Sequence, residues 1–465
     1  MGKSVVVIGA GLAGSLLCNE LSRRFNVTLL ERGRENRVEV PNVRFVNKDL
    51  AGVPTFCYGG GGTTNLWHNG LIPINATDIH DPEFRQVFKD CQPFLDQAAA
   101  SLFFKKRPFQ AEYEKLVAEV NSLSERLSVF PQGIDCLIYP KRFQKLTVDS
   151  TVRGFYQVKD IDFSVDGKRI RSVTFRTDQT KHTIDADVVV VSAGALGTPR
   201  VLGKILASIG LADDNVGVGL IDHPTGFVGK VRFKKGIANV IRELSTYDKG
   251  EYISRNAIRL KSSCGKYTAC VFFRPAVTMA NNLAIYKYKS LLGASSGILR
   301  LKNAFSNKIF HPDIIAEIFE HLFGVSIPGR TFNILFVGEQ KRGANRVFYK
   351  GDDLYVDWSI SEHELNIYRE MLAGLKAMLE GLADEINIQT DITDDWLWSI
   401  AHHSGTVSMG DTDDALVDRD LRLRHFDNVF VCDGSVIQEH SYANTGLAIG
   451  QLAFRLAKHI RDAYQ

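Results

Sequence analysis

The chain begins with a strand, a glycine-rich turn and a helix in direct succession, and this arrangement constrains its fold more than any other feature. Residues 4–9 read SVVVIG, a continuous apolar run typical of a parallel strand that is buried on both faces. A glycine pattern of the form G-x-G-x-x-G follows at once, and a second apolar run, VTLLE, ends at Glu31. The sequence therefore predicts a β-α-β unit that binds a dinucleotide at the turn. The turn residues are Gly9, Gly11, Leu12, Ala13 and Gly14.

The glycines of this turn have separate physical roles. Gly9 permits the tight turn, Gly11 lets the backbone approach a pyrophosphate, and Gly14 allows close packing of the helix on the strand. The free N–H groups at the start of the helix bind phosphate oxygens. Glu31 is placed to accept hydrogen bonds from an adenosine ribose, and its carboxylate would repel the 2′-phosphate of NADP. The pattern alone does not distinguish FAD from NAD.

Length and composition narrow the class of protein. A chain of 465 residues is long enough to predict two domains. Its net charge of +3 gives no support for nucleic acid as the main partner. None of the seven cysteines lies in a C-x-x-C pair, so we expect reduced thiols and no metal site. No apolar run is long enough for a membrane span, and the first strand leaves no room for a signal peptide. We therefore expect a cytoplasmic protein.

A second glycine-rich segment lies at residues 59–65. Four successive glycines are followed by Thr-Thr-Asn, and apolar and aromatic residues flank the run closely. A flexible surface loop would lack such neighbours, so we expect the backbone here to pass tightly against a flat ligand. The residues assigned to this contact are Gly61, Gly62, Thr63, Thr64 and Asn65.

The pattern of apolar residues changes twice along the chain. Residues 76–134 read as helical. A fully apolar strand at 187–193 leads through Ala193 and Gly194 toward a helix at 199–209. Alternating strands dominate residues 225–360, as in an antiparallel sheet with one solvated face. Helices are predicted at 361–383 and 446–463.

These patterns predict a Rossmann-like α/β domain built from discontinuous segments and an α+β substrate domain with an antiparallel sheet. We assign residues 1–75, 135–224 and 391–465 to the first domain. Residues 76–134 and 225–390 form the second. A helical insert at about 287–323 interrupts the second domain, and its apolar stripe suggests a wall or lid over the pocket, or simple packing on its own domain.

Further motifs follow in a fixed order towards the end of the chain. They are Gly219-Leu220-Ile221-Asp222-His223-Pro224, then His402-His403-Ser404-Gly405-Thr406-Val407-Ser408-Met409-Gly410, then Asp433-Gly434-Ser435 and Asn444-Thr445. Together with the two glycine segments, this succession resembles the glucose–methanol–choline (GMC) flavin oxidoreductases over nearly the whole chain. The resemblance is greatest to short bacterial members near the pyranose-oxidase and cholesterol-oxidase branches.

The resemblance implies an enzyme that binds FAD and oxidises an alcohol to a carbonyl, with hydride transfer to flavin N5. His402 falls on the position of the family's catalytic base, and Asn444 falls on its partner position. A neutral imidazole suits proton removal from a hydroxyl, and an amide orients the substrate without titrating. His403, one residue off the motif, is the next candidate. Leu66 stands where covalent-flavin members carry histidine, so we expect FAD to be held non-covalently.

The resemblance also implies further contacts with the cofactor. Asp433 matches an aspartate along the ribityl–pyrophosphate region, although it could instead cap a helix. The N–H groups of Thr445 and Gly446 would meet the flavin's pyrimidine carbonyl. Val152 matches a residue whose backbone meets the adenine. Glu339 either faces the pocket or is an exposed carboxylate at a strand end.

Several functions remain open from the sequence. The substrate is a sugar, a polyol or another small-molecule alcohol, or alternatively a lipid or sterol alcohol. Another flavin reaction, such as amine oxidation or desaturation, or an inactive FAD-binding protein, would use the same two-domain plan. The sequence indicates neither the electron acceptor nor the oligomeric state.

Overall fold

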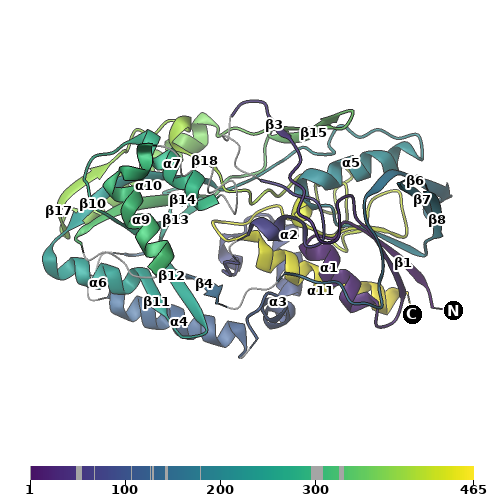
Figure 1. The fold of residues 1–465 in the computed structure, drawn as a ribbon, viewed down its shortest axis with the longest axis horizontal. Coiled ribbons are helices and arrows are strands. Elements are labelled where there is room, and N and C mark those ends of the chain that lie inside the picture. The colour runs from purple at the N-terminus through teal and green to yellow at the C-terminus, as the bar shows by residue number, and fades with distance from the viewer. Residues whose placement is uncertain are drawn as a thin grey trace.

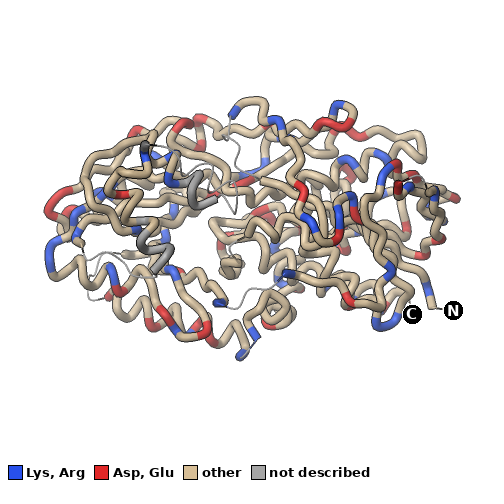
Figure 2. The backbone as a smooth tube through the Cα atoms, in the orientation of Figure 1, with Lys and Arg blue, Asp and Glu red and all other residues tan. Residues whose placement is uncertain are grey.

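The structure is a computed structural model that describes residues 2–48, 55–67, 69–105, 107–125, 127, 130–141, 145–178, 180–294, 307–323 and 329–464. A parallel sheet with its helices occupies one end of the molecule, and a large antiparallel sheet occupies the other (Figure 1). Acidic and basic residues are interspersed over both ends (Figure 2). None of the described helices is long and apolar enough to cross a membrane.

The parallel sheet takes its strands from the beginning, the middle and the end of the chain. Its order is β19-β9-β1-β2-β5, and every pairing is parallel. The predicted discontinuous α/β domain is therefore confirmed. Its strands are β1 (Ser4–Ile8), β2 (Asn26–Leu30), β5 (Arg153–Phe155), β9 (Val188–Val191) and β19 (Val429–Val431).

Helix α11 (Thr445–Ala463) holds this end of the molecule together. It packs against α1 (Leu12–Leu21), α2 (Pro82–Cys91) and α3 (Leu95–Ser101). Most of its residues are buried, as expected of a helix that has neighbours on several sides. The first and last helices of the domain thus cover each other.

Helix α5 (Gly194–Ala207) begins five residues before the predicted start at Pro199. Gly194 turns the chain directly out of β9 with a φ of 78°. Pro199 then lies inside the helix, where it cannot donate to the carbonyl of Ala195. The hydroxyl of Thr406 donates to that carbonyl instead, at 2.7 Å. A threonine some 200 residues away therefore makes the interior proline tolerable.

The antiparallel sheet has the order β11-β12-β13-β14-β10-β17, with β4 paired to β12 and β18 paired to β10. The predicted antiparallel sheet is confirmed. Strand β4 also belongs to it by pairing with β12, although residues from 135 onward were assigned to the first domain. The strands are β4 (Ile134–Pro140), β10 (Pro224–Phe233), β11 (Thr246–Asp248), β12 (Tyr252–Lys261), β13 (Thr268–Ala276), β14 (Thr331–Gly338), β17 (Ala383–Ile388) and β18 (Trp398–Ser399).

Two smaller sheets take up other strands that the sequence pattern predicts. One consists of β6 (Val158–Asp166), β7 (Arg169–Thr177) and β8 (Thr180–Asp185). The other joins β15 (Arg346–Lys350) and β16 (Asp353–Asp357) to β3 (Val43–Phe45). The strands at 346–357 therefore do not belong to the large antiparallel sheet.

Helices cover the antiparallel sheet, and one of them was not predicted. Helix α6 (Lys235–Ser245) interrupts the strands and buries Ala238, Ile241 and Leu244, which recur every three residues. The other helices at this end are α4 (Phe109–Ser124), α7 (Leu283–Ala294), α9 (Pro312–Phe323) and α10 (Glu362–Leu379). Helices α7 and α9 are the described part of the predicted insert, and residues 295–306 and the side chain of Phe319 lie outside the described residues.

Helices α7 and α9 pack against each other through a small apolar cluster. Ile285, Tyr288 and Ile314 form its centre, and Ile309 and Ile318 pack against it. Of the predicted stripe, Ile314 and Ile318 therefore pack within their own domain, whereas Ile315 is exposed. Helix α7 nevertheless also forms part of a cavity wall, as described below.

Candidate active site

A large cavity of about 2110 Å³ extends between the parallel and the antiparallel sheets. Its lining comes from the carboxyl ends of β1, β2 and β9, from the 59–67 segment, from the start of α11 and from one face of the antiparallel sheet. Pockets for small ligands commonly span about 300–1,000 Å³. This cavity therefore has room for a dinucleotide with a second molecule beside it.

The start of α1 opens onto this cavity. Gly11 is the N-cap, and neither a capping side chain nor an acidic residue occupies the first turn. A Cβ atom at Gly11 would meet open space, whereas one at Gly14 would collide with the Gly9 carbonyl oxygen. Gly9, Gly11, Leu12 and Ala13 line the cavity, and Gly14 packs the helix onto the turn. The uncapped N–H groups form an anion-binding end at the place predicted for the pyrophosphate.

Glu31 lies at the end of β2 and ties three backbone segments together. Its Oε2 accepts from Ala10 N at 2.8 Å, and its Oε1 accepts from Gly33 N at 2.7 Å and Gly59 N at 2.9 Å. Burial raises the pKa of this carboxyl, while the three backbone donors act in the opposite direction. A carboxylate offers about four acceptor positions. Glu31 lines the cavity and retains capacity for one further donor, such as a ribose hydroxyl.

The 59–65 segment folds into a tight loop and the short 3-10 helix η1 (Gly62–Leu66). Gly61 and Gly62 have φ angles of 89° and 52°. The Asn65 amide donates to the carbonyls of Gly60 and Gly62 at 3.0 and 2.8 Å, and the Thr64 hydroxyl donates to Gly61 O. Gly62, Thr63 and Thr64 line the cavity. Gly61 and Asn65, which were predicted to contact the ligand, do not line it and instead hold the loop in shape.

Leu66 and Trp67 line the cavity immediately after this loop. The Trp67 ring lies against Gly446, where a Cβ atom would collide with it. Gly446 is therefore required for contact between the loop and the start of α11.

Asp433 follows β19 and accepts three hydrogen bonds from the protein. Its Oδ2 accepts from Gly194 N at 2.9 Å and from the Thr198 hydroxyl at 2.6 Å, and its Oδ1 accepts from Ser435 N at 2.7 Å. Burial raises the pKa of Asp433, and these donors oppose the increase. Asp433 thus caps the short helix at 434–436, and it also lines the cavity with Ala193 and Gly194.

The start of α11 forms a second uncapped helix end in the cavity. Asn444 is the N-cap, but its side chain makes no capping hydrogen bond, and a Cβ atom on Gly70 would lie 2.9 Å from its Nδ2. Asn444, Thr445 and Gly446 all line the cavity. The amide of Asn444 therefore serves the cavity and does not stabilise the helix.

Val152, which the resemblance places against the adenine, lies outside the cavity lining. It is partly buried, and it donates from its N–H to Asp149 O at 3.0 Å. Val158, at the start of β6, lines the cavity and donates to Glu31 O at 2.9 Å. The backbone that approaches the nucleotide end of the cavity therefore lies six residues later than the matched position.

His402 lies at the junction of the two sheets, and hydrogen bonds define its protonation. Its Nδ1 is 2.8 Å from Nδ1 of His223, whose Nε2 is 2.9 Å from the Ser441 carbonyl oxygen. A carbonyl oxygen only accepts, so His223 Nε2 must carry the hydrogen and His223 Nδ1 must be the acceptor. His402 Nδ1 is then the donor. Neutral His402 is thus left with a basic Nε2 that has a free lone pair, and His402 is one of the residues that line the cavity.

Burial keeps these imidazoles neutral. It lowers the pKa of His402 to about 4, although the negative charge of Asp222 opposes the decrease. Burial also lowers the pKa of His223 well below its ordinary value. At neutral pH both rings are therefore in the neutral form that the hydrogen bonds require.

Asp222 contacts both His402 and His403. Its Oδ1 accepts from the backbone N–H of His402 at 3.0 Å, and its Oδ2 lies 3.0 Å from His403 Nδ1 and accepts from the Ser399 hydroxyl. Burial acts to raise its pKa, but His403, Ser399 and His402 together lower the pKa of Asp222 to about 2. His403 also lines the cavity, beside His402.

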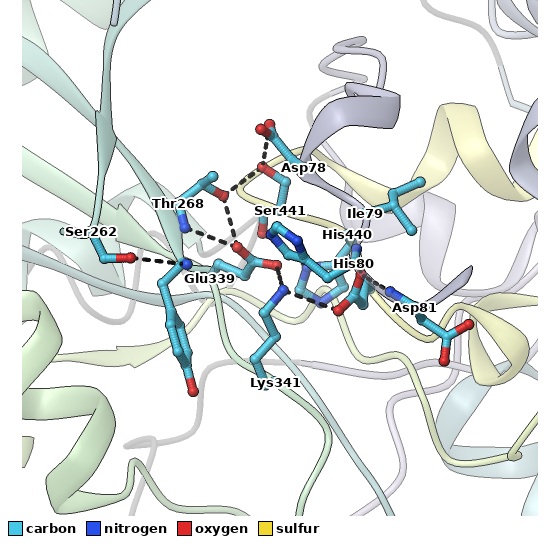
Figure 3. A network of polar contacts seen from close by, with 12 residues as sticks. Asp78, Ile79, His80, Asp81, Ser262, Thr268, Glu339, Lys341, His440 and Ser441 are labelled. Atoms are coloured by element: carbon cyan, nitrogen blue, oxygen red, sulfur yellow. Dashed lines mark hydrogen bonds and ion pairs between the residues drawn. The ribbon is translucent and has the colours of Figure 1, made fainter. Parts of the chain in front are cut away.

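Ser441 belongs to a polar network with Asp78, Thr268, Glu339 and Lys341 (Figure 3). The Ser441 hydroxyl bonds to Thr268 Oγ1 at 2.7 Å and donates to Asp78 Oδ2 at 3.3 Å. Glu339 accepts from Thr268 N and Oγ1 and from Lys341. Ser441 itself has a φ of 54°, an uncommon conformation that this network maintains. Glu339 is wholly buried and does not line the cavity, so both predicted roles for it, in the pocket or exposed, are wrong.

Most of the predicted site is therefore brought together around one cavity. His402, Asn444 and the predicted cofactor residues line it, with the exceptions of Gly14, Gly61, Asn65 and Val152. Sequence reasoning missed His223, Ser441 and His440, whose ring packs 4.1 Å from that of His223. The Asp222-His223-Pro224 motif was the available signal for the first of these. Among the described residues, no group of three or more His, Cys, Asp or Glu side chains could hold a metal ion.

Comparisons with known proteins agree with the predicted resemblance. Residues 349–453 match the family model described as GMC oxidoreductase. No curated protein matches the sequence. Among solved structures, the chain resembles pyridoxine 4-oxidase from Mesorbium loti with 16% identity, a TM-score of 0.60 and coverage of 100% of both chains.

Two further solved structures have similar scores. A formate oxidase from Aspergillus oryzae RIB40, studied for its FAD modification, is 14% identical, with a TM-score of 0.59 and coverage of 99% of this chain and 98% of that one. An FAD-dependent oxidoreductase from Chaetomium thermophilum is 13% identical, with a TM-score of 0.59 and coverage of 98% of this chain and 99% of that one. These likenesses show a shared fold over the whole chain.

Proposed function

We propose that this chain, which has the fold of the GMC oxidoreductases and matches their family model over residues 349–453, is an FAD-dependent enzyme that oxidises an alcohol to a carbonyl. The observation that carries the proposal is the neutral His402, whose Nε2 is left basic by the contact of Nδ1 with His223 and which lines a cavity large enough for FAD and a substrate. The small-molecule alcohol is the partner, and we infer a cytoplasmic location.

The residues along the cavity fit FAD in both shape and charge. The uncapped start of α1 suits the pyrophosphate, and Glu31 retains an acceptor for the ribose. The second uncapped helix end, at Thr445 and Gly446, suits the electron-rich end of a flavin. Leu66 offers no nucleophile to the cofactor, so we infer non-covalent binding. When bound, FAD supplies the acceptor for the hydride that leaves the alcohol carbon.

His402 is the proposed base for the hydroxyl proton. Its Nε2 accepts that proton as the C–H bond breaks, and the resulting imidazolium keeps its hydrogen bond to His223. Asp222 stabilises the positive charge, because it is ionised and fixes the backbone N–H of His402. The Asn444 amide is the proposed group that orients the substrate oxygen, since it lines the same cavity and does not titrate.

The decisive experiment combines flavin analysis with anaerobic mixing. The purified protein is expected to contain FAD that acid or heat releases intact, and the bound flavin is expected to bleach with an alcohol from a broad screen. His402→Ala is expected to retain FAD and to slow bleaching roughly 10²–10⁴-fold, the usual contribution of a general base. Asn444→Ala is expected to have a smaller effect.

A matched control is His363→Ala, because His363 is exposed on α10 and makes no contact with the cavity. It is expected to behave as wild type. Protein without flavin that binds NAD would refute the cofactor assignment, and flavin that remains attached to the denatured chain would refute non-covalent binding. A wild-type bleaching rate in His402→Ala would transfer the role of base to another residue, with His403 the first to test.

A further inference from the structure

Pairing across the strands of the antiparallel sheet arranges part of the cavity lining in rows. Directly paired residues of an antiparallel sheet point to the same face, and so do residues two positions apart along a strand. The first row, across β18, β10, β14 and β13, is Trp398, Thr225, Val337 and Cys270. The second row, across β10, β14 and β13, is Phe227, Leu335 and Phe272. All seven residues line the cavity.

The first row is the one that adjoins the histidines. His223 lies two residues before Thr225, and its Nδ1 is 2.8 Å from Nδ1 of His402. His402 also follows Trp398 by only four residues. The second row is two residues farther along β10, which corresponds to about 7 Å at the rise of an extended strand. An alcohol whose hydroxyl lies at His402 therefore has the first row beside its reacting carbon and the second row beside the group attached to that carbon.

Differences in side-chain size give this part of the sheet face a recess. Three of the four residues in the first row are small, and the fourth, Trp398, lies at one side of them. Phe227 and Phe272 follow them in the second row, on the two strands that flank Leu335. These two strands are about 9.6 Å apart. The recess over the small residues therefore has space for one six-membered ring, with aromatic side chains on two sides of it.

The side chains around this recess include few hydrogen-bonding groups. Phe227, Phe272, Leu335 and Val337 have side chains of carbon and hydrogen only. A sugar or polyol bound here would leave several hydroxyl groups without partners, and each such group weakens binding. An aromatic ring needs no such partners, and it is attracted by edge-to-face or offset contacts with other aromatic rings. The recess therefore favours an aromatic ring over a carbohydrate.

Helix α7 of the insert holds Phe227 in place. The ring of Tyr286 stacks on that of Phe227, with centroids 5.4 Å apart and an interplanar angle of 29°. Tyr286 is 1% exposed, and its hydroxyl donates to Asn281 Oδ1 at 2.9 Å. Lys289 of the same helix lines the cavity, with its ammonium 4.6 Å from the centre of the Phe227 ring. Phe227 therefore has a fixed position from which to contact a substrate.

We propose that the substrate is an aryl alcohol, in which the hydroxyl-bearing carbon is attached directly to an aromatic ring. The hydroxyl lies at His402, and the ring lies in the recess, in contact with Trp398, Phe227 and Phe272. This inference rests on the proposed alcohol oxidation and narrows its substrate class. Phe227 and Phe272 are the residues that determine specificity.

The kinetic test compares benzyl alcohol with cyclohexylmethanol, which has a saturated ring of the same size, and with octan-1-ol and glucose. In wild type, kcat/KM is expected to be highest for benzyl alcohol. A benzylic C–H bond is intrinsically weaker than an aliphatic one, so the decisive quantity is how a substitution changes the ratio of the two ring alcohols. Phe272→Leu is expected to lower the ratio of benzyl alcohol to cyclohexylmethanol about 2- to 10-fold, the range of an aromatic pair, and Phe227→Leu should act in the same direction.

Phe273→Leu is the matched control. Phe273 is the next residue of β13, so it points to the opposite face of the sheet, where it packs on Phe233 and Phe332 outside the cavity lining. It is expected to keep the wild-type ratio. Because a ratio of two substrates does not depend on the fraction of folded enzyme, a loss of stability in either variant does not obscure the result.

Three results would overturn the inference. The first is a higher kcat/KM for octan-1-ol or glucose than for benzyl alcohol in wild type. The second is an unchanged ratio in both Phe272→Leu and Phe227→Leu. The third is an equal change of the ratio in Phe273→Leu.

Binding measured by calorimetry separates this inference from the proposed reaction. Benzamide and cyclohexanecarboxamide have the two rings but no hydroxyl to oxidise. Benzamide is expected to bind wild type more tightly, and Phe272→Leu should reduce the difference. If no alcohol is oxidised but this preference is present, the proposed reaction fails and the aromatic site stands. If the preference is absent, the aromatic site fails, whether or not alcohols are oxidised.

Discussion

At the scale of single residues, the basic nitrogen of His402 is determined by a backbone carbonyl two hydrogen bonds away. Ser441 O fixes the tautomer of His223, and His223 fixes that of His402. His223→Phe removes the acceptor, so we expect flavin reduction by alcohol to slow at least about tenfold with FAD still bound. His223→Gln should recover part of the rate, because its amide oxygen accepts from His402 Nδ1.

A merely structural role for His223 would give a different result. Nitrogen-15 NMR of the histidine side chains reports the tautomers directly. In wild type we expect the His402 hydrogen on Nδ1, and in His223→Phe a mixture of tautomers. Unchanged tautomers together with a slower rate would show that His223 acts only by packing.

The pH dependence of catalysis follows from the burial of His402. Its sequence context predicts loss of activity near the usual histidine pKa of about 6.5, whereas burial lowers the pKa of His402 to about 4. Because the neutral form is the active one, kcat/KM for an uncharged alcohol should stay constant from pH 7 to about pH 5 and fall only below that range. An acid limb centred near 6.5, measured with a slow substrate, would contradict this assignment.

Single residues also show which features of the site could be predicted from the sequence and which could not. His402, Asn444 and Glu31 are in motifs, and motifs are local, so their places in the cavity could be predicted. The contact between His223 and His402 joins positions 179 residues apart, and no spacing rule predicts it. Glu339 was misjudged for the same reason, since its partner Thr268, 71 residues away, becomes a neighbour only when the sheet forms.

At the scale of elements, two helix ends without caps define the cofactor region. Gly11 and Gly14 belong to the same turn of α1, but a methyl group meets open space at the first and the Gly9 carbonyl at the second. Gly11→Ala should therefore leave thermal stability of the flavin-free protein nearly unchanged and weaken FAD binding. Gly14→Ala should lower the stability of the flavin-free protein by about 1–3 kcal/mol, the usual cost of overpacking.

Thermal unfolding with and without added FAD measures both variants. FAD affinity equal to wild type in Gly11→Ala would show that the cofactor does not approach this turn. Equal destabilisation by both substitutions would show that the space at Gly11 is not open in solution.

Elements were predicted best where a regular pattern was uninterrupted. The four-valine strand β9 and the long helices α10 and α11 follow directly from their apolar runs. The start of α5 was placed too late, because Pro199 is typical of a first helical turn and its compensation by Thr406 is not visible locally. Helix α6 was missed because its apolar residues lie within a region dominated by strands.

At the scale of the whole molecule, the buried histidines link stability to pH. Burial lowers the pKa of both His402 and His440 to about 4, so the unfolded chain binds their protons more tightly than the folded one. Their contribution to stability is therefore complete above about pH 6.5 and is lost as the pH falls towards 4. The carboxyls of Glu31, Glu339 and Asp433 have raised pKa values and act in the opposite sense.

A variant isolates the histidine contribution. Between pH 6.5 and 4.5, the free energy of unfolding of His440→Asn should fall by about 2 kcal/mol less than that of wild type. Urea unfolding at the two pH values measures the difference. Parallel losses in the two proteins would show that His440 is already protonated, or solvated, in the folded state.

Because α1 and α11 pack against each other, the order in which they are synthesised matters. Helix α1 leaves the ribosome long before α11, which covers its apolar side chains. The edge of β9 likewise stays unpaired until β19 has been made. Before that point the nascent protein exposes the apolar side chains of α1 and an unpaired strand edge. Interrupted translation before residue 429 should therefore yield fragments that require chaperones or are degraded, and the chain should acquire the nucleotide only after β19 and α11 have been made.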